Sequence, residues 1–126
     1  MAGPVREPVL LLRLMAEVGG AGEAEEELRL IVPRIEGYAA IEKHTIERYW
    51  KIPAYWEITL HLRPLGSAQG VYERLLGLAE GGWTRGAADE ADGDRWAVWN
   101  AAPGVELLTP RIRWAELQLR SSGATA

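Results

Sequence analysis

The chain has 126 residues, 48% of them hydrophobic, and a formal net charge of −4. This length and composition suit one domain with one core. No apolar run in the sequence approaches the roughly 18–20 residues that cross a bilayer. The absence of cysteine excludes disulfide scaffolds, thiolate nucleophiles, zinc fingers and iron–sulfur clusters, and the acidic balance disfavours general nucleic-acid binding. Because the first residues also lack the apolar centre and cleavage site of a signal peptide, we expect a single cytoplasmic domain over residues 1–126, without membrane segment, cofactor or metal.

The first third of the chain predicts a strand followed by a helix. Residues 9–18 form the strand, because apolar residues run through it and alternate with Arg13 and Glu17 in its second half. Glycines then break the strand, and the acidic residues after them suit the positive end of a helix dipole. The helix has an apolar stripe at helical spacing, made of Leu28, Ile31, Val32 and Ile35. Pro33 lies inside that stripe, so the helix either bends there or is shortened with Pro33 close to its start, and we expect it to end near Gly37.

The middle third predicts two strands and a second helix. Residues 40–63 are rich in β-branched and aromatic residues and are divided by Pro53, which favours two strands joined by a turn near residues 52–54. The second of these strands has the clearest alternation in the chain, with one face made of Trp56, Ile58, Leu60 and Leu62. Ser67 then suits the N-cap of a second helix that runs to Gly81 and Gly82.

The last third predicts three strands, at residues 83–87, 95–100 and 111–119, and a disordered tail at residues 121–126. The complete order is β-α-β-β-α-β-β-β. We therefore expect an α+β fold, with a mainly antiparallel sheet, two helices on one of its faces and a first half that matches the ferredoxin-like motif.

Two loops have the composition of ligand sites but lack the required spacing. The segment at residues 19–22 lies between a strand and a helix, where a phosphate loop would lie, but it has no Lys-Ser/Thr pair and is followed by glutamates. The acidic segment at residues 89–94 fails as an EF-hand, because its third position is Ala91 and its twelfth is Asn100. Both segments are predicted to be turns, the second a solvated hairpin turn.

Only His44 and His61 could act as a general base in a hydrolase, and they lie on different predicted strands. Glu57 shares a strand face with His61, but four residues of strand separate them by about 13 Å, so the two cannot pair. The two histidines could together serve a metal-independent ribonuclease, with Arg63 or Arg111 stabilising phosphate. This remains the enzymatic alternative.

Large amphipathic rings are more numerous than a small core needs, with six tryptophans, four tyrosines and no phenylalanine. Alternation assigns Trp50, Trp56 and Trp96 to apolar surroundings. It assigns Tyr49, Tyr55 and Trp99 to the opposite face. There they would form an aromatic patch bordered by charged residues, namely Glu57, Arg63, Arg95, Arg111 and Arg113. Aromatic centres with charged rims are typical of protein–protein interfaces.

The acidic side chains at residues 89–94 have a second interpretation, as a complement to a basic partner such as a nuclease whose cleft is built for phosphate. The patch and this acidic segment together give the residues expected to bind a partner. They are Tyr49, Tyr55, Glu57, Asp89, Glu90, Asp92, Asp94, Trp99, Arg111 and Arg113.

The tryptophan-rich strand segments resemble small immunity proteins of bacterial contact-dependent and polymorphic toxin systems. The likeness covers about half of the chain and is carried by Gly82-Trp83, DGDRWAVWN at residues 92–100, PRIRWAEL at residues 110–117 and YWEITL at residues 55–60. It implies a cytoplasmic, non-catalytic protein that binds and inactivates a cognate toxin. The alternative is a small ligand-binding or ribonuclease-like domain, expected to be a homodimer that pairs its exposed sheet faces. A bound small molecule or a concave pocket containing His61 and Arg63 would support this alternative.

Overall fold

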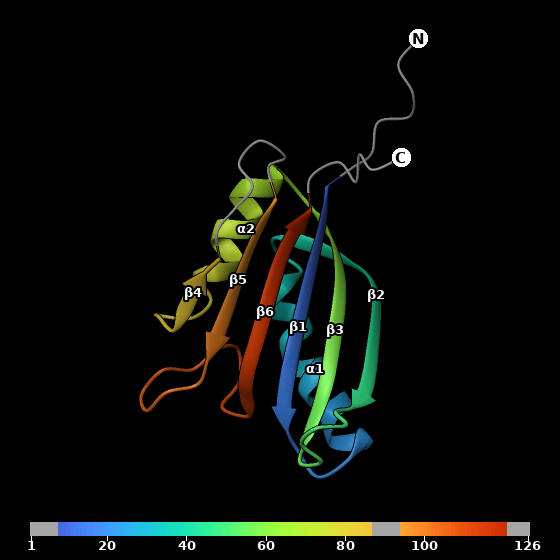
Figure 1. Ribbon diagram of the computed structural model, residues 1–126. Coiled ribbons are helices and arrows are strands. Elements are labelled where there is room, and N and C mark those ends of the chain that lie inside the picture. Colours follow the sequence, from blue (N-terminus) through green and yellow to red (C-terminus); the bar gives the residue numbers. More distant parts are fainter. Residues whose placement is uncertain (1–7, 87–93, 121–126) are drawn as a thin grey trace.

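The computed structural model describes residues 8–86 and 94–120, which contain two helices and six strands. In chain order these are β1 (Val9–Glu17), α1 (Ala21–Ile35), β2 (Ala39–Arg48), β3 (Tyr55–Pro64), α2 (Ala68–Leu76), β4 (Trp83–Arg85), β5 (Arg95–Asn100) and β6 (Ile112–Arg120) (Figure 1). The expected tail at residues 121–126 and most of the expected acidic turn, residues 89–93, lie outside the described residues.

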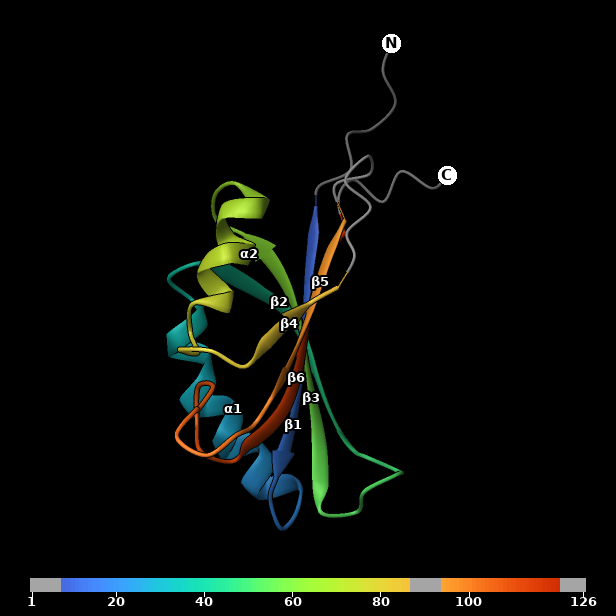
Figure 2. The same ribbon diagram turned by 60° about the vertical axis from the view of Figure 1, so that its left-hand side comes forward.

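The six strands form one sheet in the order β2-β3-β1-β6-β5-β4, and every neighbouring pair is antiparallel. Strand β3 lies between β1 and β2, which α1 connects, and β6 pairs with the other side of β1. Both helices lie on the same face of the sheet (Figure 2). The α+β fold predicted from the sequence is therefore confirmed, including the two helices on one face.

The core lies between the helices and the face of the sheet that they cover. Alternate residues of the three central strands point into it, and each of these side chains is buried: Leu10, Leu12 and Leu14 of β1, Ile58, Leu60 and Leu62 of β3, and Ala115, Leu117 and Leu119 of β6. Helix α1 adds Ile31 and Ile35, and α2 adds Tyr72 and Leu75. Each fully buried large aliphatic side chain contributes about 1.5–3 kcal/mol of transfer free energy, so this layer supplies most of the stability of the fold.

The local sequence explains the start of α2 and the position of the proline in α1. Ser67 is the N-cap of α2, and its hydroxyl accepts a hydrogen bond from the backbone N–H of Gly70 at 3.0 Å, an interaction worth about 1 kcal/mol. Pro33 lies in the last turn of α1, two residues before its end at Ile35. The helix is therefore not shortened to begin near Pro33, and in the last turn the missing N–H removes only one backbone hydrogen bond.

Strand β5 has the opposite phase from the one predicted. Trp99 is fully buried among the core side chains, whereas Trp96 is 44% exposed on the other face. Ala97 and Ala115, which neighbour Trp99 on β5 and across the ladder, are small enough to leave room for its indole. The indole Nε1 of Trp99 also donates a hydrogen bond of 2.8 Å to the carbonyl oxygen of Gly81. The predictions that Trp99 lies on an exposed face and that Trp96 lies among apolar neighbours are both wrong.

Neither of the two described helices combines the length and the apolar character that a membrane crossing requires.

Candidate protein-binding surface

One face of the sheet is not covered by helices, and we call it the open face (Figure 2). Because cross-strand partners share a face, the register that pairs Arg13 with Thr59 and Glu116 places all three side chains there. Two residues further along β1, Met15 pairs with Trp114 of β6, so these two side chains also lie on the open face. The open face thus carries charged and aromatic residues at its centre, in contrast to the aliphatic face beneath the helices.

Arg13 holds the three central strands together on the open face. Its Nε and Nη2 atoms donate hydrogen bonds of 3.1 and 2.6 Å to Oε2 of Glu57, and its Nη1 donates one of 2.7 Å to Oε1 of Glu116. The guanidinium also lies over the indole of Trp114, 5.5 Å from the ring centroid. Burial alone would lower the pKa of Arg13, but the hydrogen bonds to Glu57 and Glu116 outweigh it and raise the pKa above its ordinary value. The centre of the open face is therefore held by hydrogen bonds, and one guanidinium serves two carboxylates there.

Next to this ion pair the open face contains a hollow of about 440 Å³. The residues that line the hollow are Arg13, Met15, Tyr49, Ile52, Tyr55, Asn100, Arg113 and Trp114. They come from four strands and from the segment between β2 and β3, which bends away from the helices and forms one wall (Figure 2). The structure thus brings together three residues predicted from the sequence, Tyr49, Tyr55 and Arg113.

The segment between β2 and β3 carries the most exposed aromatic side chain of the described residues. Trp50 is 79% exposed, with its ring 6.4 Å from that of Tyr49 and 5.0 Å from the ammonium of Lys51. Ile52 beside it is also exposed. Alternation misplaced Trp50, because β2 ends at Arg48 and the period of a strand does not extend into the turn. The sequence feature that could have indicated an exposed Trp50 is its position, together with Ile52, just before the turn-forming Pro53.

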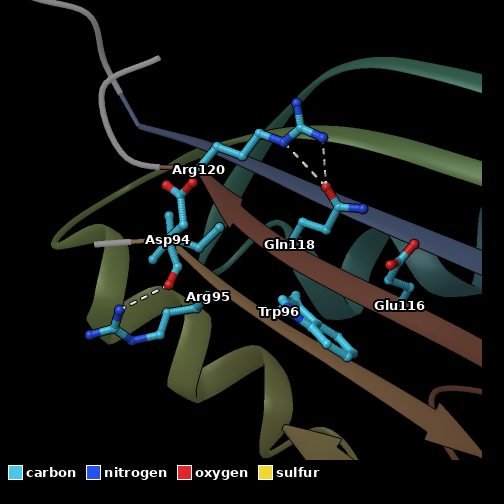
Figure 3. A pocket seen from close by; sticks show the side chains of 7 residues that line it. Asp94, Arg95, Trp96, Glu116, Gln118 and Arg120 are labelled. Atoms are coloured by element: carbon cyan, nitrogen blue, oxygen red, sulfur yellow. Dashed lines mark hydrogen bonds between the residues drawn. The ribbon is translucent and has the colours of Figure 1, made fainter. Parts of the chain in front are cut away.

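A second, shallower groove of about 350 Å³ lies on the open face where β5 meets β6. Trp96 forms part of it, with Gln118 directly across the ladder and Asp94 at its end (Figure 3). The indole of Trp96 lies over Gly86, where any added Cβ would overlap the ring. A glycine in the neighbouring chain segment thus allows a large aromatic ring to lie flat and still present an exposed surface.

The other predicted partner-binding residues are dispersed. Glu57 lies on the open face but is engaged by Arg13. Arg111 donates a hydrogen bond of 2.8 Å to Glu23 of α1 and lies 3.6 Å from Glu27, so it belongs to the helix side and does not border the aromatic residues. Asp94 lines the groove beside Trp96, whereas Asp89, Glu90 and Asp92 lie outside the described residues.

The register separates the two histidines of the enzymatic alternative. His44 pairs with Leu60, which faces the core, whereas His61 pairs with Leu11 on the open face. Side chains on opposite faces of one sheet cannot act on one bond within one chain. The hollow that includes Arg63 is lined by Pro8, Pro64 and Gly66, and His61 is not among its lining residues. Within residues 8–86 and 94–120, no cluster of three or more histidine or acidic residues could hold a metal ion.

Comparisons of the chain with protein-family models, with curated proteins and with solved structures find no match.

Proposed function

We propose that the chain is a protein-binding module whose partner docks on the open face. The observation that carries the proposal is the set of aromatic side chains on that side of the sheet. Trp50 is 79% exposed next to Tyr49, three aromatic residues (Tyr49, Tyr55 and Trp114) line the hollow, and Trp96 is exposed in the second groove. Tryptophan, tyrosine and arginine dominate the binding energy of protein interfaces, especially where they surround a pocket that excludes water. A tryptophan that is 79% exposed carries a large apolar area that a partner would remove from water.

The rigidity of the open face also supports binding. The hydrogen bonds from Arg13 to Glu57 and Glu116 fix side chains of the three central strands before any partner arrives. A surface that is already ordered loses less side-chain entropy on association. The open face therefore suits a tight, pre-formed interface.

The finer proposal is that the partner is a bacterial toxin domain, which the chain would inactivate as an immunity protein in the cytoplasm. This rests on the resemblance of the strand segments and on the acidic residues 89–94, whose carboxylates would complement a basic nuclease cleft. The open face would supply the aromatic anchors and the acidic segment a charged rim.

The first experiment measures binding to a toxin domain encoded beside the gene, or to a partner fragment that co-purifies with the chain. Trp50→Ala is expected to lower the affinity about 30-fold, equivalent to roughly 2 kcal/mol, because truncating an interface anchor has costs of this size. Titration calorimetry with the purified partner gives the dissociation constant. Growth of cells that express both proteins shows whether the toxin is neutralised.

The matched control is Leu30→Ala. Leu30 is also a large exposed apolar residue, 62% exposed, but it lies on α1 on the helix side of the sheet. This variant is expected to bind like the wild type. Weaker binding by Leu30→Ala together with unchanged binding by Trp50→Ala would place the interface on the helices and refute the proposal.

A further inference from the structure

The charged residues that line the hollow are both basic. Arg13 and Arg113 are among its eight described lining residues, and no carboxylate is. Arg13 donates hydrogen bonds to two carboxylates, which more than offset its charge. Arg113 has only Glu17 nearby, with 3.9 Å between its Nε and a carboxylate oxygen, which is too long for a hydrogen bond. Arg113 thus forms only this long ion pair, and within the described residues its guanidinium keeps hydrogen-bond donors that an incoming group can use.

Neutral hydrogen-bond donors of the same hollow are also unused. The side chains of Asn100, Tyr49 and Tyr55 have no hydrogen-bond partner within the described part of the chain. An amide and two phenols can each donate to an acceptor, and a guanidinium can donate to both oxygens of a carboxylate at once. The polar part of the hollow thus matches an anionic acceptor.

The remaining lining is apolar and aromatic. Met15 is buried, and Ile52 and the indole of Trp114 complete the apolar lining. A volume of about 440 Å³ falls within the range of ligand pockets, roughly 300–1,000 Å³, and is large enough for a carboxylate together with an aromatic ring. A bare anion would leave this apolar surface in contact with water.

We propose that the hollow binds a carboxylate carried beside an aromatic group, supplied by an acidic residue and its aromatic neighbour on the protein partner. Arg113 pairs with the carboxylate, Asn100 and the tyrosine hydroxyls donate to it, and Met15 and Trp114 contact the ring. This inference rests on the proposed function in one respect, namely that the carboxylate and the aromatic group belong to a protein partner. It also means that the centre of the interface selects a negative group, even where an acidic rim attracts a basic partner.

The test titrates the free protein with small probes, so that no partner is needed. The first pair is phenylacetate and phenylacetamide, which differ in charge. The second pair is the capped dipeptides acetyl-Phe-Glu-amide and acetyl-Phe-Gln-amide. Binding is followed by the NMR shifts of the indole N–H of Trp114 and the side-chain amide of Asn100. Fragments of this size bind with dissociation constants on the order of 1 mM, and each carboxylate is expected to bind at least about fivefold more tightly than its amide.

Two variants assign that preference to a residue. Arg113→Gln is expected to remove the preference for the carboxylate, and Arg113→Lys to retain part of it as a point charge. The control is Arg63→Gln. Arg63 is likewise an arginine on the open face, on β3 instead of β6, and it does not line the hollow, so the variant should prefer the carboxylate as strongly as the wild type does. An amide spectrum like that of the wild type verifies that each variant is folded.

The outcomes separate this inference from the proposed function. Equal affinity for carboxylate and amide, or a preference that survives Arg113→Gln, overturns the carboxylate site and leaves the Trp50 experiment unaffected. A preference seen with phenylacetate but absent with the dipeptides overturns the protein source and identifies a site for free aromatic acids.

Discussion

The two faces of the sheet use tryptophan for different purposes, and β5 carries one example of each, Trp96 and Trp99. Trp99 points to the helices, is fully buried and donates its indole N–H to the carbonyl of Gly81. Trp96 points to the open face and leaves almost half of its surface in water. A tryptophan with its polar atom satisfied and its area buried stabilises the fold, whereas an exposed one is free to stabilise a complex.

Each of these tryptophans depends on a glycine. Gly82 has a φ of 95°, and a Cβ there would lie 2.6 Å from the indole nitrogen of Trp99. Gly86 lies beneath Trp96, and its N–H donates to the carbonyl of Trp96 at 2.9 Å. The segment around β4 is thus shaped on both faces by the need to accommodate an indole.

The largest effect that distinguishes the faces is expected for Trp99→Ala. Loss of a buried indole and its hydrogen bond should lower the free energy of unfolding by about 3–5 kcal/mol, whereas Trp96→Ala should lower it by less than about 1 kcal/mol. Urea unfolding followed by circular dichroism measures both. A larger loss for Trp96→Ala would mean that the faces had been assigned in reverse.

The sequence predicted the fold where one face of an element is apolar and the other polar. Strand β3 shows this best, since its apolar residues alternate with Glu57, Thr59 and His61, and its bounds agree with the expectation to within two residues. Strand β5 lacks that contrast, because Trp96 and Val98 are as apolar as Ala97 and Trp99. Only the cross-strand neighbours on β6 decide which pair is buried, and a local pattern does not encode them.

The hollow could be predicted only in part for the same reason. Tyr49 and Tyr55 flank one turn, so sequence position alone brings them close. Their approach to Trp114 requires β1 and β3 to lie side by side and β6 to pair with the far edge of β1. This order is a long-range property of the sheet. Trp114 is one of the six tryptophans of the sequence, but the sequence does not show which side chains lie next to it.

A smaller effect tests whether the centre of the open face is pre-formed. Arg13→Met removes a half-buried guanidinium and leaves Glu57 and Glu116 facing each other without it. The free energy of unfolding should fall by roughly 1–2 kcal/mol, between the values for exposed and fully buried ion pairs. The control is Arg63→Met, whose partner Glu42 is at 3.4 Å in an exposed pair, and which should cost less than about 0.5 kcal/mol. Equal costs for the two variants, measured by urea unfolding, would show that Arg13 does not organise the face.

The smallest effect concerns the helix-covered side, where Tyr72 of α2 is buried. Burial raises the pKa of its phenol above the ordinary value near 10, since the charged form loses hydration, while nearby Arg85 opposes the rise. As the pH rises, Tyr72 therefore loses its proton in the unfolded chain before it does so in the folded protein. The free energy of unfolding is unaffected below pH 10 and falls between the unfolded and the folded pKa of Tyr72, by no more than about 1.4 kcal/mol per pH unit. Tyr72→Phe should lose less stability than the wild type between pH 9 and pH 11, measured by urea unfolding at each pH with pH 8 as the reference. Parallel losses in the two proteins would mean that water reaches this phenol, and the contrast between a dry helix-covered face and a hydrated open face would not hold at α2.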